Sequence, residues 1–231
     1  MRSLPQGEEK ARAVRTLFDT ISGRYDLVNR VMTLGLDAGW RRRAVRELGL
    51  PADSLVADLA CGTGDLCREA AAAGFRPVGF DFSHGMLRAA RTPARLVQAD
   101  ILRLPLRDAS IDGATCGFAL RNVVDLGEFF AELARVVRPG GRIALLDAST
   151  PDNPVLRAGH GMYFNHVVPF IGGVLSNRPA YAYLPKSMAY LPPPGGMLSM
   201  LRFAGFPDVR RHQLTGGLTQ LFVATRANVQ G

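Results

Sequence analysis

Short apolar segments alternate with amphipathic segments between residues 54 and 148, and this alternation predicts the central part of the fold. Each apolar segment has the length of a buried strand, and each amphipathic segment repeats its apolar positions at helical spacing. The predicted strands cover 55–60, 76–80, 95–98, 111–117 and 142–147, and the predicted helices cover 64–73, 83–91 and 126–137. Because alternating strands and helices are joined by right-handed crossovers, we expect a parallel sheet. The turn Pro139-Gly140-Gly141 is expected to end the last of these helices.

The chain before this alternating region has a helical pattern. Apolar residues such as Leu17 and Ile21 fall at helical spacing, and a second amphipathic stretch runs from Trp40 to Leu50. We therefore expect an N-terminal helical cap over residues 1–50, placed where it can form a lid over a ligand.

The chain after the alternating region contains an insertion and a hairpin. A helix is predicted at 196–204, followed by strands at 206–214 and 218–226 around a short link that contains glycine, which is typical of a hairpin. Residues 149–195 break the alternation, so we expect an insertion there within a domain that covers residues 51–231.

The insertion contains an apolar and aromatic stretch from Met162 to Leu175, which is too short to span a bilayer. It could wall a hydrophobic substrate pocket, dock on a membrane surface or pack against the sheet. His166 lies in this stretch and is the histidine nearest to the predicted pocket, so we expect it on the substrate side.

The first predicted strand leads into a glycine turn, Ala60-Cys61-Gly62-Thr63-Gly64-Asp65. A strand, a tight turn and a helix in this order bring a nucleotide-like ligand close to backbone N–H groups, and glycine lets the ligand approach. A phosphate-binding loop would need a lysine, and a dinucleotide fingerprint would need a third glycine. Asp65 would repel a pyrophosphate but tolerates the sulfonium cation of S-adenosyl-L-methionine. We therefore interpret the turn as a binding site for S-adenosyl-L-methionine; the alternative is an ordinary strand–turn–helix whose carboxylates only cap the helix.

Polar residues also follow the second and third predicted strands. Because the carboxyl ends of parallel strands line the ligand crevice, we expect Asp81 to bind the ribose hydroxyls. Asp100 and Ile101 offer a polar contact and an apolar wall for the adenine. A helix cap or a turn former is the alternative role of Asp100.

Arg121 and Asn122 follow the fourth predicted strand and could bind and polarise a substrate oxygen. A structural salt bridge from Arg121 to Asp125 or Asp147 is the competing interpretation.

The cap segment Phe18 to Asn29 mixes aromatic, acidic and amide groups in a way that packing alone does not need. Tyr25 and Asn29 could face a substrate, or they could make structural hydrogen bonds only.

Composition and charge narrow the choices of compartment and partner. The formal net charge is +8, but the basic residues are scattered. We interpret the one run of three, Arg41-Arg42-Arg43, as a solvated helix face, with a phosphate-binding patch as the alternative. No Lys/Arg-rich arm appears, which disfavours an RNA-binding module. The three cysteines lack metal-ligand spacing, so we expect no metal and a reduced, cytoplasmic setting. The sequence has no run long enough for a transmembrane helix and no signal-peptide pattern.

Several motifs together carry a resemblance to a known family. They are Phe18-Asp19 with Arg24-Tyr25-Asp26 and Asn29, Asp58 to Leu66, Asp81-Phe82-Ser83, Leu104-Pro105, Gly117 to Val123, Leu133 to Gly141, Tyr183-Leu184-Pro185 and Leu214 to Gly217. The chain resembles the ubiquinone/menaquinone-biosynthesis C-methyltransferase family, within the class I S-adenosyl-L-methionine-dependent methyltransferases. The Arg-Tyr-Asp segment together with Leu-Arg-Asn-Val is the specific part of this resemblance.

The resemblance implies an α/β fold with a Rossmann-like, mostly parallel seven-stranded sheet, a C-terminal antiparallel hairpin and the N-terminal cap. It implies methyl transfer from S-adenosyl-L-methionine to the ring of a polyprenylated quinol precursor, such as demethylmenaquinol. The alternative is a class I methyltransferase for another apolar small molecule, such as a polyketide or terpenoid phenol. We expect a lipophilic quinol as partner, no nucleic acid, and a cytoplasmic location with the inner face of the membrane within reach; a homodimer stays open.

The predicted site combines residues from the turn, the strand ends and the cap. Arg121 is expected to stabilise the developing phenolate, Asn122 to orient the ring oxygen, and Tyr25 and Asp26 to relay the proton. The predicted cofactor-binding residues are Asp58, Ala60, Gly62, Thr63, Gly64, Asp81, Phe82, Asp100, Ile101 and Gly117. The predicted substrate-binding residues are Asn29, Phe118 and His166.

Overall fold

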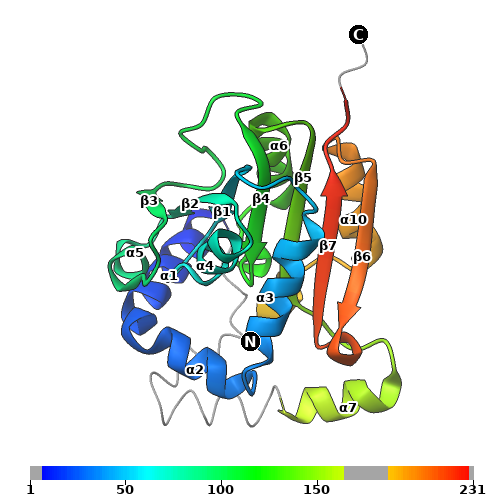
Figure 1. Cartoon of the computed structure of the whole chain (residues 1–231). Coiled ribbons are helices and arrows are strands. Elements are labelled where there is room, and N and C mark those ends of the chain that lie inside the picture. The colour runs from blue at the N-terminus through cyan, green and yellow to red at the C-terminus, as the bar shows by residue number, and fades with distance from the viewer. Residues whose placement is uncertain (1–6, 164–186, 229–231) are drawn as a thin grey trace.

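A computed structural model of the chain describes residues 7–163 and 187–228, and its centre is a seven-stranded sheet in the order β3-β2-β1-β4-β5-β7-β6 (Figure 1). The strands are β1 Leu55–Leu59, β2 Arg76–Asp81, β3 Arg95–Gln98, β4 Ile111–Gly117, β5 Val137–Ala148, β6 Asp208–Leu214 and β7 Thr219–Thr225. β1 to β5 pair in parallel, and β7 runs antiparallel to both β5 and β6. The predicted mostly parallel sheet and the C-terminal hairpin are therefore confirmed.

The strand β5 begins earlier than the sequence pattern predicts. The preceding helix ends at Val136, one residue before its predicted end, but the chain enters β5 at once and passes through Pro139-Gly140-Gly141 within the strand. The pairing with β4 shifts register between Ile111 and Gly113, and Gly140 has a φ of 73°. An irregularity in the ladder thus accommodates residues that were predicted to form a separate turn.

Helices cover both faces of the sheet. The described helices are α1 Gly7–Ile21, α2 Tyr25–Met32, α3 Leu36–Glu47, α4 Asp65–Ala72, α5 His84–Ala89, α6 Leu126–Val136, α7 Pro154–Met162 and α10 Pro194–Phe203. In the view of Figure 1, α3 lies in front of the sheet and α6 and α10 lie behind it. Trp40 and Val45 of α3 pack with β-strand residues such as Val56 on one side, and Phe129 and Phe130 of α6 belong to the core on the other.

The N-terminal segment divides into two parts. α3 packs against α4 and β5 and is part of the layer that covers the sheet. α1 and α2 extend away from this layer and form the helical cap at the lower left of Figure 1. A small apolar cluster that includes Ile21 and Val28 joins these two helices. The predicted division at residue 50, between a helical cap and one following domain, stays a prediction.

The structure describes the insertion in part. Asn153 caps α7 by accepting hydrogen bonds from the backbone N–H groups of Val155 and Leu156. His166 lies outside the described residues. No helix within residues 7–163 and 187–228 is long and apolar enough to cross a membrane.

Candidate active site

The glycine turn between β1 and α4 has a backbone that few side chains would permit. Gly62 and Gly64 have φ values of 55° and 84°. A Cβ on Gly64 would lie 2.5 Å from the Cγ2 atom of Thr92, so this position accepts glycine alone. Ala60 adopts a φ of 52° without that freedom, and strain of this kind is found where a ligand must be approached closely.

Asp81 fixes this turn to the end of β2. Its buried carboxylate accepts a hydrogen bond from the Gly62 backbone N–H at 2.8 Å and another from the Ser83 backbone N–H at 2.8 Å. Burial raises the pKa of Asp81, while the two backbone hydrogen bonds act in the opposite direction. The carboxylate keeps further lone pairs that can accept from ligand hydroxyls.

The first cavity, about 420 Å³ in volume, opens beside the turn and gathers most of the predicted cofactor residues. Those that line it are Asp58, Ala60, Gly62, Thr63, Asp81, Phe82, Asp100, Ile101 and Gly117. Gly64 does not line it and contributes through the shape of the turn. Asn122 lines this cavity as well, although it was predicted on the substrate side.

Asp58 lies at the buried base of the first cavity. Its carboxylate accepts hydrogen bonds from the Thr115 hydroxyl at 2.9 Å and from the Cys67 thiol at 3.3 Å. Burial raises the pKa of Asp58 to about 7, and these hydrogen bonds oppose the rise.

The second cavity, about 690 Å³ in volume, is mainly apolar and lies between the cap, α7 and the link between β6 and β7. Asn29 and Arg121, both predicted on the substrate side, line this cavity. Four residues line both cavities, and we call them the neck: Phe18, Tyr25, Arg41 and Phe118. Two chambers of different polarity therefore meet at one ring of side chains.

Tyr25 is the neck residue whose hydroxyl lies among polar groups. Its ring packs edge-on against Phe18, with the ring centroids 5.8 Å apart. Burial raises the pKa of the Tyr25 hydroxyl, and the hydrogen bond with Asn29 and the charges of Arg121 and Arg41 oppose this rise. A neutral tyrosine at this place can donate its proton in a hydrogen bond to a substrate oxygen.

Arg121 makes the salt bridge that was left open as an alternative. Its guanidinium pairs with Asp147, which is fully buried, and its backbone N–H donates to the same carboxylate at 3.1 Å. Asp125 has a different role, since it caps α6 by accepting from the Glu128 backbone N–H at 3.0 Å. Arg121 therefore faces the second cavity as half of a buried ion pair.

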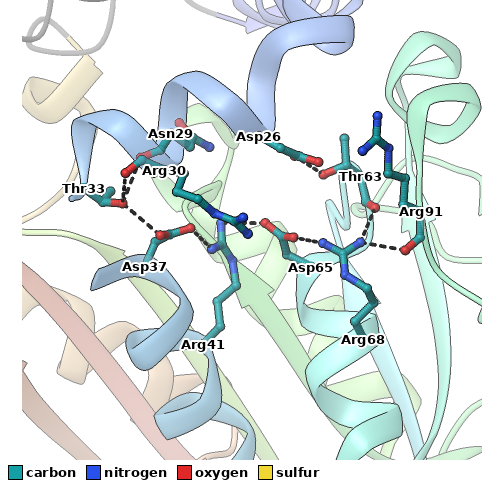
Figure 2. Close-up of polar contacts among 10 residues, drawn as sticks. All are labelled: Asp26, Asn29, Arg30, Thr33, Asp37, Arg41, Thr63, Asp65, Arg68 and Arg91. Carbon is teal, nitrogen blue, oxygen red and sulfur yellow. Dashed lines mark hydrogen bonds and ion pairs between the residues drawn. The ribbon is translucent and has the colours of Figure 1, made fainter. Parts of the chain in front are cut away.

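Asp26 lines neither cavity. Its carboxylate accepts a hydrogen bond of 2.5 Å from the Thr63 hydroxyl, which joins α2 to the glycine turn (Figure 2). Its role in proton relay stays a prediction, and the contact gives it a second role in holding the turn.

Arg41 is the functional candidate that the sequence interpretation missed. The run Arg41-Arg42-Arg43 was predicted as a solvated face, which fits the exposed Arg42 but is wrong for Arg41, whose exposed fraction is 6%. The helix turns Arg41 inward, where it pairs with Asp37 and with Asp65 at 3.1 Å (Figure 2). The available signal was an aspartate four residues earlier, at the spacing of a helical ion pair.

Known proteins of similar sequence match this chain over nearly its whole length. A model of the ubiE/COQ5 methyltransferase family matches residues 6–226. The chain is 43% identical over 222 residues to the ubiquinone/menaquinone biosynthesis C-methyltransferase UbiE of Syntrophotalea carbinolica, covering 92% of this chain and 94% of that protein. It is 41% identical over 229 residues to the demethylmenaquinone methyltransferase of Deinococcus radiodurans, covering 95% of each.

A solved structure shares the fold. It is Haemonchus contortus phosphoethanolamine N-methyltransferase 2 in complex with S-adenosyl-L-methionine, with a TM-score of 0.62 at 13% identity. The match covers 82% of this chain and 53% of the other, so this chain spans about half the length of that protein.

Proposed function

We propose a function from the premise that this chain belongs to the ubiE/COQ5 methyltransferase family. It transfers the methyl group of S-adenosyl-L-methionine to a ring carbon of a polyprenylated quinol precursor, with demethylmenaquinol converted to menaquinol. The observation that carries this proposal is that a first cavity with more polar groups and a more apolar second cavity share the lining residues of the neck.

The residues of the first cavity fit the proposed donor. Four carboxylates line it, those of Asp58, Asp65, Asp81 and Asp100, together with the buried Arg41 and the exposed Arg12 and Arg15. The carboxylates offer favourable partners to a ligand that carries a sulfonium and an ammonium group. When bound, S-adenosyl-L-methionine supplies an electrophilic methyl group. Asp81 would hold the ribose hydroxyls, and the glycine turn would give the donor room beside β1.

The acceptor side needs a place for an apolar ring and a group that stabilises its developing phenolate. The second cavity offers apolar walls, with polar groups at Tyr25, Asn29 and Arg121. Positioning the ring carbon at the neck makes the reaction effectively intramolecular, which supplies much of the reduction in barrier. Arg121 and Tyr25 direct a positive charge and a hydroxyl proton at the phenolate oxygen, where preorganised electrostatics act strongly. Asn122, which lines the first cavity, orients the ring oxygen from that side.

A direct assay tests this proposal. Purified protein with methyl-labelled S-adenosyl-L-methionine is expected to label a short-chain demethylmenaquinol, and not a panel of phenolic polyketides or terpenoids. Label that enters only the non-quinol acceptors would replace the quinol with another apolar substrate. Calorimetry that detects no binding of S-adenosyl-L-methionine, but does detect binding of NADH or ATP, would overturn the donor as well.

We further propose that the protein meets its lipophilic substrate at a membrane surface, through an apolar rim around the second cavity. We define the apolar rim by its exposed residues, which are Leu27, Val31, Leu34, Leu36, Val155, Leu156 and Met162. They come from α2, the following turn, the start of α3, and α7, and the Tyr163 hydroxyl joins α7 to α2 by donating to the Met32 carbonyl at 2.7 Å. Leu34 is 81% exposed at a φ of 52°, so a strained backbone presents it to the outside. Self-association stays a separate prediction.

Two charges in the apolar rim are expected to weaken membrane contact. In the double variant Leu34→Glu with Val155→Glu, binding to sedimented phosphatidylglycerol-containing vesicles should fall about tenfold or more, because two apolar side chains no longer enter the bilayer interface. The matched control is Phe203→Glu on α10, since Phe203 is 96% exposed but lies outside the apolar rim. Equal vesicle binding by both variants would remove the apolar rim as the docking surface.

A further inference from the structure

Figure 2 shows a chain of polar contacts that links the cap to the glycine turn through Arg41. On one side, the Thr33 hydroxyl donates to Asp37 at 2.8 Å, and Asp37 pairs with Arg41. On the other side, Arg41 pairs with Asp65 at 3.1 Å, and Asp65 also pairs with Arg68. The pair of Arg41 and Asp65 is therefore the step at which this chain of contacts crosses from α3 to α4.

The far end of this chain of contacts holds the backbone of the glycine turn. The Arg68 guanidinium donates to the Thr63 carbonyl at 3.3 Å and to the Arg91 carbonyl at 2.8 Å. Asp65 begins α4 and lines the first cavity. A displacement of Asp65 would therefore move Arg68 and, through it, the part of the glycine turn that is proposed to lie against the donor.

Arg41 also contacts the wall between the two cavities. Its guanidinium carbon lies 5.5 Å from the centroid of the Phe118 ring, and the Trp40 ring lies 6.2 Å from the same ring. Phe118 has a φ of 60°, so its position depends on neighbours that hold an unfavourable backbone. Both Arg41 and Phe118 belong to the neck, and a guanidinium over an aromatic face is attracted to it.

We propose that Arg41 is a positioning residue that couples the binding of donor and acceptor, an inference that rests on the proposed function. A ligand in either cavity orders the neck, and Arg41 carries that order to Asp65 on one side and Phe118 on the other. The second ligand then binds to a neck that has already lost its conformational entropy, so its binding is more favourable and the two ligands bind with positive cooperativity. By linkage, each ligand strengthens the binding of the other by the same factor.

Calorimetry with two unreactive probes tests the coupling. S-adenosylhomocysteine takes the place of the donor, and 2,3-dimethyl-1,4-naphthoquinone, which has no quinone-ring C–H left to methylate, takes the place of the acceptor. In the wild-type protein, a saturating amount of the quinone should lower the Kd of S-adenosylhomocysteine about fivefold or more, at the lower end of typical coupling between sites. The reverse titration should give the same factor.

Variants of Arg41 and of its neighbour Arg42 distinguish a specific role of Arg41 in the coupling from a general effect of removing one positive charge. Arg41→Gln should reduce the coupling to less than about twofold, below the typical range. Arg41→Lys keeps the buried charge for folding but lacks the planar fork that bridges two carboxylates, so it should lose the coupling too. Arg42→Gln is the matched control, because Arg42 is the exposed neighbour on α3 and lines neither cavity, and it should keep the wild-type coupling.

The outcomes distinguish this inference from the proposed function. If Arg41→Lys is folded and shows the same coupling factor as Arg42→Gln, the proposed role of Arg41 is overturned. The role is also overturned if, in the wild-type protein, the Kd of one probe does not change when the other probe is bound. Absence of S-adenosylhomocysteine binding in the wild-type protein would instead overturn the proposed function. Should Arg41→Gln fail to fold, Arg41→Lys decides the question.

Discussion

Replacing Asp81 with asparagine is expected to weaken the binding of S-adenosyl-L-methionine about a hundredfold, because the variant loses two hydrogen bonds to a charged acceptor. One is the 2.8 Å bond from the Gly62 backbone N–H, and the other is the bond that the proposed ribose would donate. The asparagine amide group can present an N–H to the Gly62 N–H where the carboxylate presented an oxygen. The turn would then move away from the position that admits the donor.

Calorimetric titration of the variant with S-adenosyl-L-methionine measures this effect. Asp112→Asn is the control, because the Asp112 carboxylate also accepts from a backbone N–H, that of Leu55 at 2.7 Å, but lines neither cavity. We expect the control to bind the donor with the wild-type Kd. An Asp81→Asn protein with unchanged donor affinity would show that Asp81 has only a structural role.

The sequence predicts the sheet well because its signal is local and repeated. Each strand of the alternating region has its own apolar segment and its own turn, so one misjudged boundary leaves the order intact. β5 shows the limit of this reasoning. Proline and two glycines predict a turn, but the residues on either side, Val137 and Arg142, both pair with β4, and Gly140 and Gly141 exchange backbone hydrogen bonds with Arg226 just after β7. These partners cannot be deduced from the segment itself.

The sequence predicts the residues that lie together at the strand ends. It predicts less well which side chains are buried and which partners they have. The first cavity collects nine of the ten predicted cofactor residues, since the topology brings the strand ends together. Arg41 and Arg42 look alike in sequence, and only the packing of α3 against α4 separates a buried cation from an exposed one. The choice between Asp125 and Asp147 as partner of Arg121 likewise depends on tertiary contacts.

The pair of Arg121 and Asp147 complicates any test of catalysis by single substitution. Arg121→Ala leaves the fully buried carboxylate of Asp147 without its cation, which should lower the free energy of unfolding by about 3–5 kcal/mol. Chemical denaturation should show this loss. Arg138→Ala removes the cation of a more exposed ion pair with Asp112, so it should cost less than about 1 kcal/mol.

The double variant Arg121→Met with Asp147→Leu separates folding from chemistry. It removes both charges of the ion pair, so no buried charge is left without a partner as in Arg121→Ala. Because leucine is larger than aspartate and cannot accept from the backbone N–H at position 121, the variant is used only if chemical denaturation shows a folded protein. Turnover of the labelled quinol should still fall about a hundredfold or more, the typical cost of removing a group that stabilises a developing oxyanion. The Kd of S-adenosyl-L-methionine should stay near the wild-type value, because Arg121 lines the second cavity and not the first. A stable double variant with wild-type turnover would mean that the ion pair serves the fold and that another group, with Tyr25 as the nearest candidate at the neck, stabilises the phenolate.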